Sequence, residues 1–166
     1  MPKNYTKEGQ KLPLFGIGPY LIAGITVVNL IVLILTSYIF KIGTLDGIWV
    51  WVFRLIGALL FAEGAVVWFI GAVKSDMDNS IADNKLKTDG IYAWVRNPMY
   101  SGIWFVIAGM SFMWHNIFSV PMLIIDWLIL TIVIKKTEER WLMDLYGNEY
   151  AEYIKRVNRF IPWKRK

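Results

Sequence analysis

Long apolar runs separated by polar segments dominate the pattern along this chain. Residues 17–40 contain no charged side chain, and residues 48–73 form a second apolar run that only Arg54 and Glu63 interrupt. Each run exceeds the roughly 20 residues that an α-helix needs to cross a bilayer. The pattern therefore predicts two membrane-spanning helices in the first half of the chain.

A third apolar region, residues 102–133, is too long for one helix and short for two full spans. His115, Asn116 and Pro121 interrupt it. We therefore expect a tight hairpin of two tilted or shortened helices, with His115 as a structural residue of its turn. The two expected helices cover residues 99–114 and 117–134.

Basic residues are distributed unevenly over the segments between these spans. They precede the first helix, occur in the loop 74–98 and follow the last span in the tail 135–166, whereas the other two loops carry only Lys41. The positive-inside rule then places both termini and the loop 74–98 in the cytoplasm. No cleavable signal peptide is expected at the start of the chain.

The sequence therefore predicts an all-α integral membrane protein, a single domain over residues 1–166 with about four transmembrane helices. Its expected location is the cell membrane in a prokaryote or the endoplasmic reticulum in a eukaryote. The net charge of +5 fits cytoplasmic loops beside anionic headgroups better than binding of nucleic acid.

Small residues recur regularly in the second span. Gly-Ala pairs stand at 57–58, 64–65 and 71–72. Because seven residues are close to two helical turns, the pairs form one stripe, and small residues let membrane helices approach closely. We interpret the stripe as a packing seam; the alternative is that backbone near Gly64 or Gly71 admits a cofactor.

A first polar signature lies between the second and third spans. Asp76 to Asn84 has the composition of a solvated connector. Beyond it, the planar fork of Arg96 suits a carboxylate or phosphate. Pro98 favours an extended Asn97 and a helix that starts at or after Pro98, which leaves free N–H groups nearby. The alternative is that Arg96 is an ordinary interface anchor.

A second signature follows the last span. It begins with Glu138 and Glu139. Glu139 lies one helical turn from Lys135 and could form a surface salt bridge with it. The functional alternative is a carboxylate that contacts a cofactor. The tail 141–163 is expected to be an amphipathic cytoplasmic helix, either lying on the membrane surface or covering a site.

Composition excludes several kinds of chemistry. Cysteine is absent, so disulfides, thiolate metal sites and a cysteine nucleophile are excluded. A single histidine, His115, also excludes a multi-histidine metal centre, and no metal site is expected.

Taken together, the two signatures resemble the isoprenylcysteine carboxyl methyltransferase and phospholipid methyltransferase superfamily over roughly residues 50–163. The matching residues are Leu86-x-Thr88-x-Gly90-x-Tyr92, Arg96-Asn97-Pro98-x-Tyr100-x-Gly102, Glu138-Glu139, Gly147, Tyr150, Tyr153, Arg156, Arg159 and Pro162. The resemblance implies an all-helical membrane methyltransferase that uses S-adenosylmethionine and releases S-adenosylhomocysteine. Its acceptor would be a lipid or lipid-like molecule at the cytoplasmic membrane face.

The resemblance also implies roles for particular residues. Those expected to bind the cofactor are Gly90, Tyr92, Arg96, Asn97, Pro98, Tyr100, Gly102, Glu138 and Glu139. Those expected to act in catalysis or to orient the acceptor are Glu139, Arg156 and Arg159. Asn97 stands where eukaryotic members usually carry histidine, and because an amide does not titrate, no proton transfer is assigned to it.

Two other classes of protein are also compatible with the sequence. Membrane sterol or enone reductases that use NADPH carry a segment similar to the one from Arg96 to Tyr100, although the Glu pair and the Tyr-rich tail favour the methyltransferase. A non-catalytic membrane subunit is a third interpretation. The acceptor stays open between a prenylcysteine-type carboxylate, a phospholipid amine and a small thiol. The bilayer is the expected surrounding, and no obligate protein partner is evident.

Overall fold

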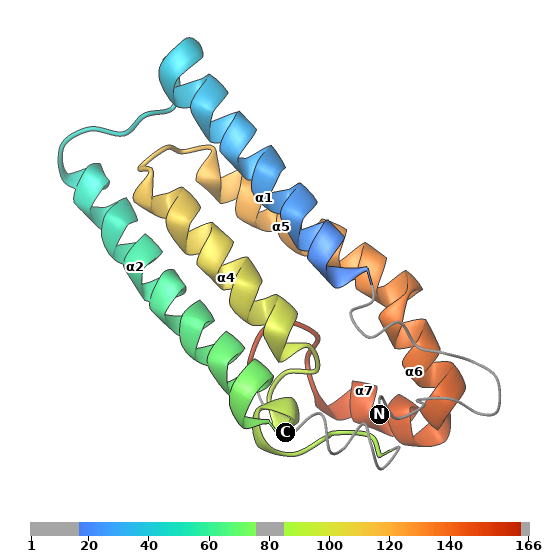
Figure 1. Cartoon of the computed structure of the whole chain (residues 1–166). Coiled ribbons are helices and arrows are strands. Elements are labelled where there is room, and N and C mark those ends of the chain that lie inside the picture. The colour runs from blue at the N-terminus through green and yellow to red at the C-terminus, as the bar shows by residue number, and fades with distance from the viewer. Residues whose placement is uncertain (1–16, 76–84, 164–166) are drawn as a thin grey trace.

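The structure is a computed structural model that describes residues 17–75 and 85–163. Within these ranges the regular elements are helices (Figure 1). They are α1 (Gly18–Ile34), α2 (Ile48–Phe69), α4 (Pro98–Met113), α5 (Ser119–Lys136), α6 (Glu138–Tyr146) and α7 (Asn148–Arg156). The four predicted spans coincide with α1, α2, α4 and α5. The basic N-terminal residues and the expected connector from Asp76 to Asn84 lie outside the described residues.

Three short helical segments complete this description. Helices α1 and α2 each continue into a wider π-helical turn, Leu35–Ile39 and Ile70–Lys74 respectively. A single 3-10 turn, Gly90–Ala93, lies in the loop that precedes α4. Among the described residues, two helices are long and apolar enough to cross a membrane: Gly18–Ile39 with 22 residues and Ile48–Lys74 with 27 residues.

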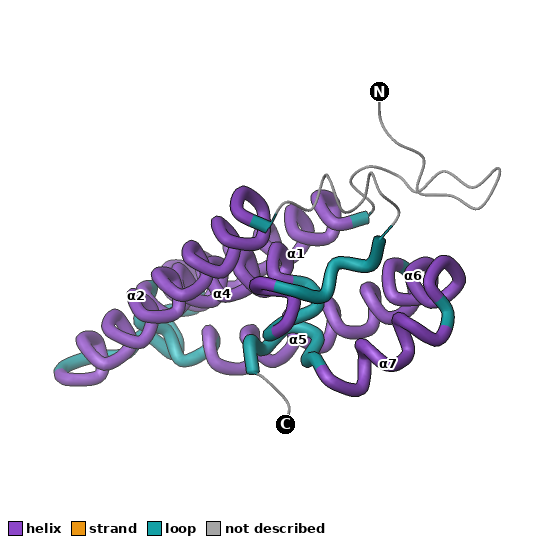
Figure 2. The backbone as a smooth tube through the Cα atoms, turned by 90° about the horizontal axis from the view of Figure 1, so that it is seen from below, coloured by secondary structure: helices purple, strands orange, loops and turns teal. Residues whose placement is uncertain are grey.

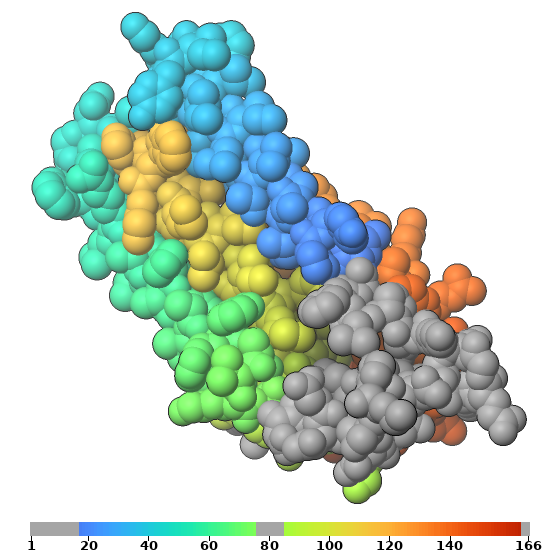
Figure 3. Space-filling view, in the orientation of Figure 1, coloured from blue at the N-terminus to red at the C-terminus, as the bar shows by residue number. Residues whose placement is uncertain are grey.

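The long helices α1, α2, α4 and α5 run side by side, and α6 and α7 lie at one end of this bundle (Figures 1 and 2). In the space-filling view α4 lies between α1 and α2 (Figure 3). The connections from α1 to α2 and from α4 to α5 are at the end opposite α7. Helices α4 and α5 follow one another across a short turn that contains His115.

Glycines bring α2 and α4 into close contact. A Cβ atom built on Gly64 would lie 2.6 Å from the carbonyl oxygen of Gly102, and one built on Gly57 would lie 2.6 Å from that of Gly109. Gly71 faces the ring of Pro98 in the same way. The Gly-Ala stripe of the second span is therefore a packing seam, as predicted, because the backbone of α4 fills the space beside these glycines.

Buried polar side chains hold α1 against the rest of the bundle. The amide of Asn29 donates hydrogen bonds to both carboxylate oxygens of Asp126 in α5, at 3.1 and 3.0 Å. The hydroxyl of Ser111 in α4 donates to the Asn29 side-chain oxygen at 3.2 Å. Near the far end of α1, Asn116 donates to Thr36 at 3.3 Å. Such bonds between helices in apolar surroundings fix the position of α1.

Large apolar side chains remain exposed along the outer faces of the bundle. They include Val28 and Ile31 on α1, Leu55, Leu59 and Val66 on α2, and Ile124 and Ile125 on α5. Extended apolar surface of this kind marks a face that contacts lipid or another apolar partner.

The prediction of one amphipathic helix over the tail 141–163 is wrong. Gly147 interrupts the tail with φ 53° and separates α6 from α7, and the chain leaves the helical conformation after Arg156. Glycine adopts a positive φ without the steric penalty that a Cβ atom would impose. The break turns the apolar side of α7 inward, so that Tyr150 and Tyr153 are buried in the protein.

Candidate functional site

The loop before α4 and the segment after α7 run together at the end of the bundle. Val95 and Asn158 form an isolated parallel bridge, and the Arg96 backbone N–H donates to the Asn158 carbonyl at 2.8 Å. Asn97 donates to the Arg159 carbonyl twice, through its backbone N–H at 3.2 Å and through its side-chain amide at 3.3 Å. The two polar signatures therefore meet directly.

An ion cluster links these two segments to the start of α6. The guanidinium of Arg159 donates to the two carboxylate oxygens of Glu139 through Nε and Nη2, each at 2.8 Å. Arg96 Nη2 lies 3.2 Å from Glu139 Oε1. Glu139 is thus paired with two arginines inside the protein, whereas the salt bridge with Lys135, one of the two alternatives from the sequence, would have placed it at the surface.

Arg96 is the least satisfied member of this cluster. Its side chain is 6% exposed, and within the described part of the chain Nε and Nη1 are buried without a hydrogen-bond partner. Burial lowers the pKa of Arg96 from its ordinary value, and the charge of Glu139 opposes this shift. Buried donors without acceptors are rare in folded proteins, so these two N–H groups are suited to an anionic ligand.

A second carboxylate lies beside the start of α4. Asn97, with φ −126° and ψ 66°, precedes Pro98, and α4 begins at that proline as predicted. The hydroxyl of Tyr100, in the first turn, donates a hydrogen bond to Glu138 Oε1. Burial raises the pKa of Glu138, although the bond from Tyr100 acts in the opposite direction. The site therefore contains one carboxylate held by arginines and another held by a phenol.

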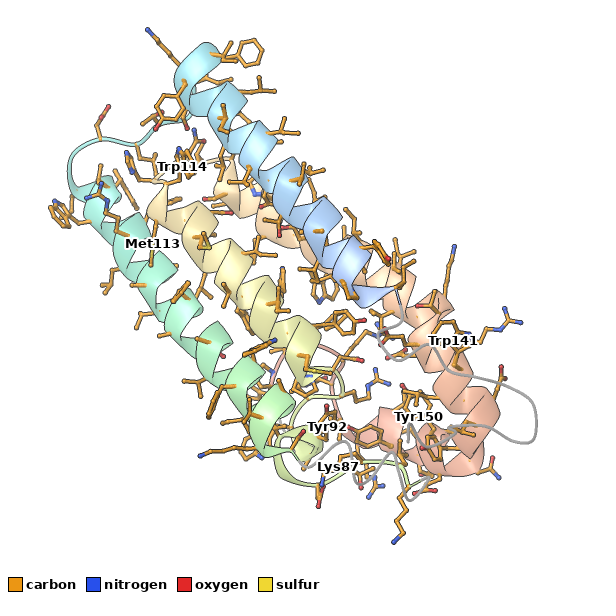
Figure 4. The ribbon with its side chains drawn as sticks, in the orientation of Figure 1. Lys87, Tyr92, Met113, Trp114, Trp141 and Tyr150 are labelled. Atoms are coloured by element: carbon orange, nitrogen blue, oxygen red, sulfur yellow. The ribbon has the colours of Figure 1, made fainter. Side chains whose placement is uncertain are left out.

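Tyrosines of α7 support the loop that precedes α4. Tyr150 and Tyr153 are buried, and the hydroxyl of Tyr153 donates to the Tyr92 carbonyl at 2.6 Å. Burial raises the pKa of Tyr92 to about 12. Figure 4 shows Lys87, Tyr92 and Tyr150 at the same end of the molecule, far from Trp114 at the other end.

Most of the residues predicted for the site lie together. Arg96, Asn97, Glu139 and Arg159 form one bonded group, with Tyr100 and Glu138 paired beside the start of α4. Pro98 is buried and packs near Gly71. Gly90 is exposed with φ 55°, so its contribution is the turn itself.

Two predicted residues lie elsewhere. Gly102 belongs to the α2–α4 seam, where an added Cβ would lie 2.5 Å from the backbone nitrogen of Trp68. Arg156 is exposed, and its Nε donates to the Glu152 carbonyl within α7 at 3.4 Å. Within residues 17–75 and 85–163, no three acidic or histidine side chains gather as metal ligands.

Sequence reasoning missed two relationships in the site. It did not predict that Arg96 and Arg159 share Glu139, because no local spacing connects three segments so far apart. It also gave no indication that Gly18, near the start of the first expected helix, lies against the phenol of Tyr100. In the sequence, the adjacent Gly18 and Pro19 were the feature that could have drawn attention to this position.

Residues 52–149, more than half of the chain, match the phospholipid methyltransferase family. The chain is 36% identical over 87 residues to protein-S-isoprenylcysteine O-methyltransferase of Schizosaccharomyces pombe, an alignment that covers 48% of this chain and 34% of that protein. It is 36% identical over 83 residues to methanethiol S-methyltransferase 1 of Bradyrhizobium diazoefficiens, covering 49% and 27% respectively.

A third relative is protein-S-isoprenylcysteine O-methyltransferase B of Arabidopsis thaliana, 32% identical over 81 residues that cover 48% of this chain and 41% of that protein. The chain therefore matches less than half the length of each of these relatives. No solved structure matches it significantly. The helical fold, the two signatures in contact and the extent of the family match lead to one conclusion: the chain belongs to the phospholipid methyltransferase family.

Proposed function

We propose that this protein transfers a methyl group from S-adenosylmethionine to a lipid or lipid-like acceptor at the cytoplasmic face of a membrane. Membership of the family supports methyl transfer. The observation that carries the choice of cofactor is the burial of Arg96 Nε and Nη1, which have no hydrogen-bond partner among the described residues. Both are donors of a charged guanidinium and would form charge-assisted hydrogen bonds with anionic oxygens, and S-adenosylmethionine carries a carboxylate.

The charges of the site fit the rest of that cofactor. Glu139 is neutralised by Arg159 and approached by Arg96, so the cluster of these three groups has a net positive charge. Glu138, which accepts a hydrogen bond from the uncharged Tyr100, supplies a negative charge nearby. A positive and a negative group side by side suit a ligand that has a carboxylate at one point and cationic centres at another. Glu138 is accordingly proposed to face the cationic part.

When bound, the cofactor supplies a methyl group already activated on a sulfonium. The protein then needs to align the acceptor and exclude water more than it needs a strong base. Asn97 cannot titrate, and its amide is bonded to Arg159. The site therefore favours an acceptor that is ionised by itself, such as a carboxylate or a thiolate. The names of the relatives, which specify isoprenylcysteine O-methyl and methanethiol S-methyl transfer, agree with this preference.

We also propose that α1, α2, α4 and α5 all cross the membrane, with both termini and the site in the cytoplasm. The exposed apolar side chains on α1, α2 and α5 support this arrangement. At a rise of about 1.5 Å per residue, α4 and α5 are somewhat shorter than a hydrocarbon core of about 30 Å, so we propose that the bilayer is locally thinned around them. An acceptor with an apolar tail would reach the site sideways from the bilayer. Arg156, exposed at the end of α7, is proposed to contact its headgroup.

Calorimetric titration of the detergent-purified protein with S-adenosylhomocysteine tests the proposal, with NADPH titrated as the paired control. Binding of S-adenosylhomocysteine alone is the expected result. Binding of NADPH alone would identify a reductase, and binding of neither would contradict the cofactor assignment. A screen of carboxylate, thiol and amine acceptors with radiolabelled methyl donor would then identify the acceptor class.

A further inference from the structure

Helix α1 lies outside the part of the chain that matches the family, residues 52–149, yet its first residue touches the site. Gly18 is buried, and a Cβ atom built on it would overlap the hydroxyl oxygen of Tyr100 and lie 2.9 Å from the ring carbon that carries it. The same hydroxyl donates the hydrogen bond to Glu138. The backbone of α1 is therefore one wall of the space that holds the Tyr100 phenol.

Helix α1 is not placed to give way easily. Asn29 ties α1 to Asp126 through two hydrogen bonds, and Ser111 adds a third bond from α4. Leu21 and Ile22 of α1 pack on the apolar core beside Tyr100. The atoms of Tyr100 that face Gly18 are at the end of a side chain that can rotate. An added side chain at position 18 would thus displace the phenol rather than the helix.

We propose that Gly18 is a positioning residue for the cofactor site, because the absence of its side chain lets the Tyr100 hydroxyl reach Glu138. The inference rests on the function proposed above, in which Glu138 faces the cationic part of the cofactor. Gly18 touches neither ligand nor reacting atoms and acts only through Tyr100. The first helix then contributes to cofactor binding as well as to anchoring in the membrane.

Gly24 offers a matched control in the same helix, because a Cβ atom built there meets nothing within 4 Å. Affinities for S-adenosylmethionine and S-adenosylhomocysteine are measured by calorimetry for the wild type, Gly18→Ala, Gly24→Ala, Tyr100→Phe and the double variant Gly18→Ala/Tyr100→Phe. Gly18→Ala should weaken binding about tenfold, the order expected for one hydrogen bond to a charged group. Gly24→Ala should bind as the wild type does.

The double variant separates positioning from general packing. Phenylalanine lacks the oxygen that the new Cβ would overlap most closely. Its ring carbon, 2.9 Å from that Cβ, can shift without breaking a hydrogen bond, so Gly18→Ala should cause no further loss of affinity in the Tyr100→Phe background. Equal losses in both backgrounds, or wild-type affinity for Gly18→Ala, would overturn the proposal. If Gly18→Ala fails to fold, a double variant that folds and binds like Tyr100→Phe supports it, and a double variant that also fails to fold overturns it.

Failure of the proposed function gives a different result. A wild-type protein that binds neither S-adenosylmethionine nor S-adenosylhomocysteine contradicts that function, and with it the ligand-binding role of Gly18. The thermal unfolding midpoints of the same five proteins would then show whether Gly18 and Tyr100 are still coupled as packing partners.

Discussion

Arg159, in the segment that follows α7, holds Glu139 at the start of α6 through two parallel hydrogen bonds of 2.8 Å. The pair closes the tail onto the bundle, and Arg96 approaches the same carboxylate at 3.2 Å from the loop before α4. One buried carboxylate therefore joins three segments. In the folded protein this carboxylate compensates the positive charges of the two arginines.

Replacing Glu139 by alanine should destabilise the protein by about 3 kcal/mol, because removal of one partner leaves buried charges uncompensated. Thermal unfolding in detergent measures the effect. Glu149→Ala, at an exposed position of α7, is the control and should change stability by less than about 0.5 kcal/mol. A Glu139→Ala protein as stable as the wild type would show that the arginines find other acceptors or solvent.

Replacing Arg96 by lysine should weaken binding of S-adenosylhomocysteine about ten- to a hundredfold, since the hydrogen bonds from the guanidinium N–H groups are lost while the positive charge remains. Calorimetry measures the affinity, and the unfolding midpoint verifies that the variant is folded. Arg140→Lys, on the exposed side of α6, serves as the control. Unchanged affinity in Arg96→Lys would place the carboxylate of the cofactor elsewhere.

Replacing Glu138 by glutamine keeps an oxygen that can accept the Tyr100 hydrogen bond but removes the charge. The raised pKa of Glu138 means that its carboxyl group holds a proton more tightly in the folded protein than in the unfolded chain. Its contribution to stability is complete below the unfolded value of about 4.3 and is lost as the pH rises through the folded value. The stability of Glu138→Gln relative to the wild type should therefore increase between about pH 4 and pH 7.

Unfolding midpoints of the two proteins across that pH range test this prediction, and a difference that does not change with pH would contradict it. The same variant reports on the ligand. If Glu138 faces the sulfonium, Glu138→Gln should lose more affinity for S-adenosylmethionine than for S-adenosylhomocysteine, which lacks that charge. Equal losses would indicate that the carboxylate contacts a part that both molecules share.

Replacing Gly102 by alanine should destabilise the bundle by about 1–3 kcal/mol, the usual cost of overpacking a tight interface. The new Cβ would lie 2.5 Å from the Trp68 backbone nitrogen and 2.7 Å from the Gly64 carbonyl oxygen, and backbone atoms cannot rotate away. Thermal unfolding in detergent is the measurement, with Gly24→Ala as the control. A neutral Gly102→Ala would mean that α2 and α4 separate more easily than their contact suggests.

The bounds of the long helices were predictable from local pattern alone. Three local signals were available: uncharged runs of sufficient length, Pro98 at a helix start, and glycines at seven-residue intervals. Each of them depends only on neighbouring residues or on one face of a helix. Their consequences do not depend on the rest of the fold, so the expected spans coincide with the observed helices. The same kind of local signal gave a wrong prediction for the tail. The amphipathic pattern continued through Gly147, a residue that adopts φ 53° and separates two helices.

The sequence by itself determined which residues are chemically equipped for the site and that both signatures belong to the same end of the molecule. Only the tertiary structure decided how they pair: Glu139 with Arg96 and Arg159, Glu138 with Tyr100, and Gly102 with α2 rather than with the site. The physical reason is that an ion pair or a steric contact depends on distances of a few ångströms between segments far apart in the chain. The packing of several helices sets those distances together, and no single segment encodes them.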